Sequence, residues 1–131
     1  MTDATADKRA RALDGMLADP RFSDRFATVW TELLLGEAKM KDGVDHAAFR
    51  SWLRARMMER APWDAIVREI VGGEGRNSPG GAVRERGIAA MSTTVEPEDK
   101  GVHGAVNYPL RYRTMVEDLA GKTSRAFLGI Q

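Results

Sequence analysis

The stretch Asp19-Pro-Arg-Phe-Ser-Asp-Arg-Phe-Ala-Thr-Val-Trp-Thr-Glu-Leu-Leu-Leu35 gives the clearest helical signal in the chain. Asp19 is a residue type that favours the cap of a helix, and Pro20 suits the first helical position, where its missing N–H costs nothing. The apolar side chains that follow recur at the spacing of a single helical stripe, namely Phe22, Phe26, Val29, Trp30, Leu33 and Leu34. We therefore predict a long amphipathic helix here.

Helical patterns continue on both sides of this stretch. Before it, a helix is expected over about residues 6–17, with the large apolar side chains Leu13, Met16 and Leu17 on one side. After it, Asp45 can cap a third helix, which Pro62 ends. A fourth helix follows Pro62, and Gly72-Gly73 is expected to end it in the left-handed conformation. The residues expected to be structural are Phe22, Phe26, Trp30, Phe49, Trp52, Leu53, Trp63, Ile66, Val67 and Phe127.

A long segment without periodicity separates these helices from the end of the chain. Residues from about 73 to 113 are rich in glycine and turn signals, although 83–91 could form one short helix. A closing helix is expected over about residues 114–130, because Thr114 and Glu117 have the spacing of a capping box. We find no strand pattern and no internal repeat.

The predicted fold class is all-α: a small bundle of about five helices with a long glycine-rich loop before the last one. Residues 1–131 have the length of a single domain or domain fragment, with a helical body over about 6–72. A hydrophobic content of 43% indicates a folded chain rather than a disordered one.

The composition excludes several classes of function for this chain on its own. The chain has no cysteine, which excludes disulfides, cysteine metal sites, thiol catalysis and covalently attached c-type haem. The net charge is +1, so no overall field steers the chain to nucleic acid or an anionic membrane. The N-terminus lacks the apolar core of a signal peptide, and no apolar run is long enough to predict a membrane span. As given, the chain is expected to be soluble and cytoplasmic.

Five stretches, taken in order, are similar to a known bacterial family. They are Asp19–Phe26 with Trp30, Asp42–Trp52, Ala61–Glu69, Ala105–Tyr112 and the closing helix Glu117–Gln131. Their order and spacing resemble the planctomycete cytochrome-associated domain, domain-of-unknown-function family 1549. The resemblance covers nearly the whole chain from about residue 13 onward.

The resemblance implies a place in a larger protein. Family members are typically large exported bacterial proteins, often fused to cytochrome c-like modules. A Cys-x-x-Cys-His segment usually follows the equivalent of Phe127–Gln131, and this chain does not contain it. The resemblance therefore implies c-type haem in a missing downstream segment, and no cofactor in this chain. It also implies a periplasmic or extracellular location if the chain is a fragment of such a protein.

Two histidines are the first candidates for a site. His46 follows a helix cap, where a solvated imidazole is the default interpretation. His103 lies in a polar loop, where a surface histidine is preferred over a haem or metal ligand. Their spacing matches no zinc signature, so no metal site is predicted. Noncovalent haem ligation by His103 with Met91 or Met115 stays open, although methionine at helical spacing usually belongs to the core.

The other polar patterns have plainer interpretations. Gly72–Gly81 lacks the preceding strand and the Gly-Lys-Ser/Thr ending of a phosphate loop, so a helix end and linker is preferred. Loop carboxylates can bind calcium or act as acid and base, but solvated loops are preferred for Asp42, Asp45, Glu96, Glu98 and Asp99. The near-zero net charge favours pairing within the chain, rather than nucleic-acid binding, for Arg50, Arg54, Arg56, Arg60, Arg111 and Arg113.

We therefore expect a non-catalytic structural or interaction module, without catalytic residues. Its expected interaction surface, for self-association or a protein partner and not for nucleic acid or membrane, consists of Phe127, Leu128, Ile130, Arg111 and Tyr112. The alternative is a hydrolytic or haem-binding protein that acts through residues 74–113. A hydrolase would use loop carboxylates with Asn107 or His103, and at least two of these groups would have to meet in one pocket.

Overall fold

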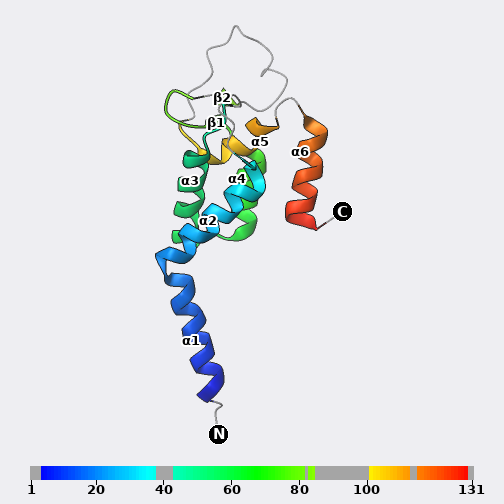
Figure 1. The fold of residues 1–131 in the computed structure, drawn as a ribbon. Coiled ribbons are helices and arrows are strands. Elements are labelled where there is room, and N and C mark those ends of the chain that lie inside the picture. Colours follow the sequence, from blue (N-terminus) through cyan, green and yellow to red (C-terminus); the bar gives the residue numbers. More distant parts are fainter. Residues whose placement is uncertain (1–3, 38–42, 82, 85–100, 113–114, 130–131) are drawn as a thin grey trace.

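The computed structural model describes residues 4–37, 43–81, 83–84, 101–112 and 115–129. Its helices are α1 (Ala4–Ala18), α2 (Pro20–Leu35), α3 (His46–Met58), α4 (Trp63–Gly72), α5 (Asn107–Arg111) and α6 (Val116–Thr123) (Figure 1). A 3-10 turn, η2 (Gly104–Val106), leads into α5, and a π-helical turn, η3 (Ser124–Leu128), continues α6. The fold is all-α, as predicted.

Local sequence signals set several of the helix ends. The Asp19 carboxylate accepts a hydrogen bond from the Arg21 backbone N–H at 2.9 Å, and Pro20 occupies the first position of α2. The Asp45 carboxylate accepts from the Ala48 backbone N–H at 2.8 Å and caps α3. Both caps were predicted, because a short carboxylate satisfies an N–H that the helix itself leaves unpaired.

We expected no strand, but the structure contains one short antiparallel pair. Strands β1 (Gly75–Arg76) and β2 (Val83–Arg84) pair antiparallel over two residues each. Two residues give no alternating pattern, so the sequence contains no detectable signal for them. The Arg76 backbone also binds the later segment, because its N–H donates to Gly101 O at 2.9 Å and its carbonyl accepts from His103 N–H at 2.7 Å.

The core lies between α2, α3, α4 and α5. It consists of the buried side chains Ala27, Leu34, Leu35, Phe49, Leu53, Ile66, Ile70 and Tyr108. Phe49, Leu53 and Ile66 were predicted to be structural and are fully buried. Trp52 and Val67 are half-buried beside them.

The buried face of α2 differs from the predicted one. The side chains that it buries are Ser23, Ala27, Thr31, Leu34 and Leu35, whereas Leu33 is 56% exposed. Small residues on this face let α3 pack closely, and the Thr31 hydroxyl stays satisfied by donating to Ala27 O at 2.6 Å. Leu33 and Val29, which were assigned to the same stripe as Leu34, therefore lie on an outer face of the helix.

The segment expected to be irregular contains a buried helix. Helix α5 is five residues long, and its Tyr108 and Leu110 side chains are buried. One turn and a half of helix is too short to show a period in the sequence. The irregular segment therefore ends before η2, and not near residue 113.

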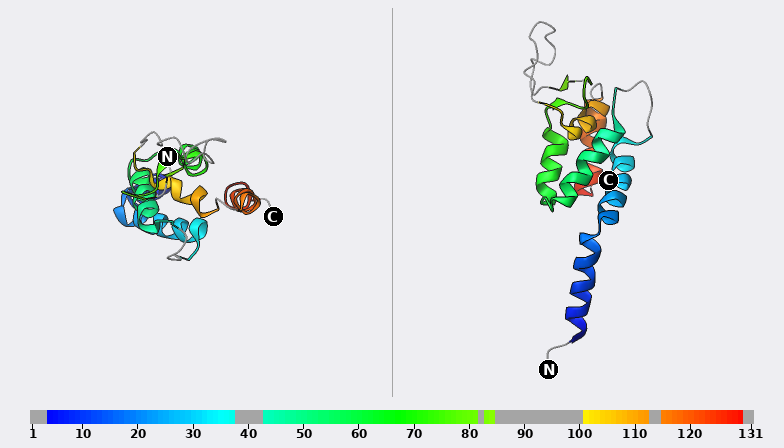
Figure 2. Two further views of the ribbon diagram at one scale, coloured as in Figure 1. Left: turned by 90° about the horizontal axis from the view of Figure 1, so that it is seen from above. Right: turned by 90° about the vertical axis from the view of Figure 1, so that its left-hand side faces the viewer.

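Helices α1 and α6 extend the fold beyond this core. Figures 1 and 2 show α1 projecting from one end of the bundle that α2, α3, α4 and α5 form. Helix α6 begins at Val116 with Met115 at its cap position and no side-chain cap. Glu117 is thus the second helical residue rather than the third of a capping box, and Thr114 lies outside the described residues.

The glycine at the end of α4 serves a close contact rather than a left-handed cap. Gly73 has φ −57° and ψ 138°, so the expected left-handed residue is absent at this position. A Cβ added there would lie 2.7 Å from Glu69 O and 3.4 Å from the Ala105 side chain. The glycine is needed because a side chain would collide with the Glu69 carbonyl of α4, while η2 lies at ordinary contact distance.

Gly104 of η2 lies in close contact with α3, and a substitution there can test this contact. A Cβ at Gly104 would lie 2.5 Å from both the Ala48 carbonyl oxygen and Trp52 Cβ, so Gly104→Ala should lower the free energy of unfolding by about 2 kcal/mol. Gly72→Ala is the matched control, because its Cβ would meet open space, and it should change stability by less than about 0.5 kcal/mol. Urea denaturation of both variants measures the difference, and equal effects would contradict the close contact.

Candidate functional site

His103 lies in a polar network between α3 and α4. Its Nε2 is 3.5 Å from the Glu69 carboxylate, and its ring packs on Trp52 with 5.7 Å between ring centroids. The other oxygen of Glu69 accepts a hydrogen bond from Arg56 at 2.6 Å, and Arg56 also donates to Glu59 at 2.7 Å. The Glu59 hydrogen bond is the largest cause that raises the pKa of Arg56. His103 is thus a half-buried member of an ion-pair network and not a solvated loop residue.

Asn107 is the centre of a buried hydrogen-bond network. Its side-chain oxygen accepts from the Asp45 backbone N–H at 2.7 Å and from Asn77 Nδ2 at 2.9 Å. Its Nδ2 donates to Asn77 O at 3.1 Å and to Gly104 O at 3.0 Å. Asn77 Nδ2 also donates to Gly43 O at 2.8 Å. All hydrogen-bonding positions of the Asn107 amide are used within the chain, so they are not available to a substrate.

Arg111 and Tyr112 hold the end of α2. Arg111 Nε donates to Leu35 O at 3.0 Å, and the Tyr112 hydroxyl donates to Leu34 O at 2.9 Å. These carbonyls belong to the last turn of α2, where the helix leaves them without a partner. Both residues were predicted as part of an interaction surface, and the structure places these donors against the protein interior instead. A partner contact through their remaining surface stays a prediction.

An aromatic cluster joins α2, α4 and η3. Trp30 stacks on Phe127 with 5.9 Å between centroids and an interplanar angle of 8°, and it lies 4.7 Å from Trp63. Phe26 contacts both tryptophans, at 5.7 Å and 5.6 Å. Phe127 therefore packs inward, whereas the neighbouring Leu128 is 69% exposed. Ile130, the remaining predicted surface residue, lies outside the described residues.

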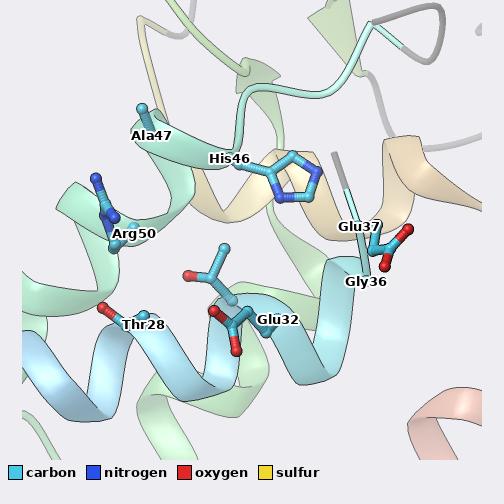
Figure 3. Close-up of a pocket in the computed structure, with 8 residues that line it drawn as sticks. Thr28, Glu32, Gly36, Glu37, His46, Ala47 and Arg50 are labelled. Carbon is cyan, nitrogen blue, oxygen red and sulfur yellow. The ribbon is translucent and has the colours of Figure 1, made fainter. Parts of the chain in front are cut away.

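An open cleft of about 710 Å³ lies between the end of α2 and the start of α3. Figure 3 shows His46 and Arg50 on α3, Glu32 on α2 and Glu37 in the segment that follows α2. The cleft thus carries charges of both signs on exposed or half-buried side chains. It was not predicted, because its polar residues come from two helices whose relative placement has no local sequence signal.

The remaining candidates do not converge on a site. Arg54 pairs with Asp24, and Asp45 is used as a helix cap. Met115 is exposed at the start of α6, on a different element from His103. Asp42, Met91, Glu96, Glu98, Asp99 and Arg113 lie outside the described residues. Within the described ranges, no three His, Asp or Glu side chains gather in a way that could hold a metal ion. No helix in the part of the chain that the structure describes is both long and apolar enough to cross a membrane.

Comparison with known proteins identifies one family. The family PSCyt2, described as a protein of unknown function (DUF1549), matches residues 1–131. Neither a curated protein nor a solved structure matches the chain.

The buried amide of Asn107 should be one of the most sensitive positions in the chain. Asn107→Ala removes four hydrogen bonds and leaves buried backbone groups unpaired, so it should lower the free energy of unfolding by about 3 kcal/mol. Ser51→Ala on the exposed side of α3 is the control and should have an effect below about 0.5 kcal/mol. Thermal and urea denaturation measure both, and a stable Asn107→Ala variant would show that the network is dispensable.

The two buried tyrosines predict a loss of stability at alkaline pH. Burial is the main cause that raises the pKa of both Tyr108 and Tyr112 above the ordinary value. Above about pH 10 the unfolded chain releases phenol protons that the folded chain retains, so stability falls as pH rises from there toward the folded pKa. Urea denaturation from about pH 8 to pH 11 should show this fall. The decrease in the free energy of unfolding with pH should be smaller in the double variant Tyr108→Phe/Tyr112→Phe. An unchanged decrease in that variant would exclude the two tyrosines as the cause.

Proposed function

The chain belongs to the PSCyt2 family of proteins of unknown function (DUF1549), and we propose that it is a non-catalytic structural or interaction module of a larger exported bacterial protein. The observation that carries the proposal is an apolar surface that the fold leaves uncovered beside the aromatic cluster. The candidate residues Asn107 and His103 contact other groups of the fold.

Four exposed apolar side chains, Val29, Leu33, Trp63 and Leu128, belong to α2, α4 and η3, the elements that meet in the aromatic cluster. Trp63 is itself a member of that cluster, in contact with the rings of Trp30 and Phe127. Large apolar side chains on a rigid base are typical of the central part of a protein interface. We therefore name Val29, Leu33, Trp63 and Leu128 the docking surface.

The proposed occupant is a protein segment that presents apolar side chains to the docking surface. The family resemblance suggests that this segment belongs to a neighbouring haem-bearing module, in the periplasm or outside the cell. The chain has no cysteine, so any c-type haem that works with it would be attached to that partner. In this proposal the chain supplies shape and contact area, and the partner supplies the redox chemistry.

The alternative of a hydrolytic or haem-binding role has less support. Asn107 is saturated by hydrogen bonds within the fold, and among the described residues His103 contacts Glu69 of α4. Neither residue lines the cleft between α2 and α3. Among the described residues, the groups that a hydrolase would need in one pocket do not meet, which favours the interaction module.

The proposal predicts a specific contact at the docking surface. A photo-crosslinking amino acid at position 128, in cells of the source organism, should give one dominant protein adduct that mass spectrometry can identify, and the same group at position 51 should not. Leu33→Glu should reduce this adduct about tenfold without loss of stability, because Leu33 is 56% exposed and the new charge would have to be buried in the complex. Ser51→Glu is the matched control. Equal adducts at both positions, or an adduct indifferent to Leu33→Glu, would count against the docking surface.

A further inference from the structure

Helix α1 is exposed at every position from residue 7 to residue 18. It projects from the bundle without another element beside it (Figures 1 and 2). Its large apolar side chains Leu13, Met16 and Leu17 are 50%, 66% and 56% exposed. An isolated helix of 15 residues is marginal in water, and Gly15 weakens this one further. The helix therefore gains stability from any surface that covers its apolar side.

Residues 10–17 of α1 fit one heptad of a two-stranded coiled coil. With Ala10 and Leu17 at a positions, Leu13 falls at the d position between them. These residues lie on one face and are all exposed. In the same frame Arg9 occupies the g position and Asp14 the following e position. We propose that α1 pairs in parallel with α1 of a second copy of this chain.

The charges select a second copy and a parallel orientation. In a parallel pair, a g residue lies beside the e residue five positions later in the partner helix. Arg9 of each copy would then face Asp14 of the other, which gives two symmetric ion pairs. An antiparallel pair would instead bring the two e edges together, and with them the carboxylates of Asp14 from both copies.

The ion pairs within the single chain agree with this assignment. Asp7, the other e-position carboxylate, already pairs with Arg11 four residues later in its own helix. Within the described ranges, Arg9 and Asp14 have no ion-pair partner. The two charges that remain uncompensated on the flanks of the apolar face are thus the two that a parallel second copy would neutralise.

The pairing would place both bundles at the same end of the coiled coil. It uses α1 alone, whereas the docking surface uses α2, α4 and η3, so the two proposals involve different residues. Loss of self-association would leave the crosslink at position 128 intact, and loss of that crosslink would leave self-association intact. The two proposals can therefore fail separately.

Sedimentation equilibrium of the full chain, from micromolar to millimolar concentration, tests the pairing. We expect a reversible monomer–dimer equilibrium, with a helical content per chain that rises with concentration. Leu13→Asp should lower the association constant about tenfold or more, because each dimer loses two buried d-position side chains. Ala12→Asp, outside the a and d positions, is the matched control. A wild-type chain that stays monomeric, or a dimer insensitive to Leu13→Asp, overturns the proposal.

A charge exchange and a crosslink test the orientation. Arg9→Asp should weaken association several-fold. Lys8→Asp makes the same charge change at the distant f position and should weaken association less. Adding Asp14→Arg to Arg9→Asp should restore the association. Because the chain has no native cysteine, Leu17→Cys provides a single thiol. It should form a disulfide-linked dimer on mild oxidation, since position 17 meets itself only in a parallel, in-register pair. A double variant that remains weak, or a dimer that does not crosslink, overturns the parallel pairing.

Discussion

The hydrogen bonds of the Asn107 amide are the contacts on which the rest of the bundle depends. One side chain joins the start of α3, the loop after α4 and the turn that leads into α5. Those segments carry backbone groups that would otherwise be buried without partners, which costs about 1–3 kcal/mol each. With these segments held together, Tyr108 lies in the core, and Arg111 and Tyr112 donate hydrogen bonds to carbonyls of α2. A short segment late in the chain thus completes a core whose other side chains come from α2, α3 and α4.

Helix α2 shows how one element serves both the core and the surface. Its inner face is lined by small residues such as Ala27 and Thr31, so α3 packs close to it. Its outer face carries Phe26, Trp30 and Leu33, of which only the rings are partly covered by α4 and η3. The polar residues Asp24, Arg25 and Glu32 are also exposed on this helix, which is therefore amphipathic. Among its apolar side chains, Val29 and Leu33 remain exposed beside the aromatic cluster.

The features that were predicted correctly from the sequence are the ones that local chemistry determines. The caps at Asp19 and Asp45 were predicted because they require only a carboxylate and three or four neighbouring residues. The all-α class followed from helical periodicity. Helix α5 was missed because five residues show no period, and the inner face of α2 was misassigned because Ser23 and Thr31 are polar. Their burial is set by the approach of α3, which is a tertiary effect.

The candidate site was less predictable than the fold. His103 and Asn107 were identified as notable residues, but their partners Glu69 and Asn77 come from distant segments and carry no spacing signal. Arg111 and Tyr112 were predicted as part of an interaction surface, and for Arg111 pairing within the chain was preferred over nucleic-acid binding. Their hydrogen bonds to Leu35 and Leu34 depend on where α2 ends in space. Such roles follow from the arrangement of elements and not from the order of residues.

The backbone bonds between Arg76 and the segment at Gly101 and His103 have a consequence for how the chain can vary. They join two points about 25 residues apart in sequence. The entropy of closing a flexible loop grows only logarithmically, so doubling its length costs about 0.6 kcal/mol. Insertions among residues 85–100 should therefore cost little stability, whereas changes at Asn77 would break its hydrogen bonds to Asn107. The interval is a place where evolution, or a protein engineer, can graft new sequence onto an unchanged scaffold.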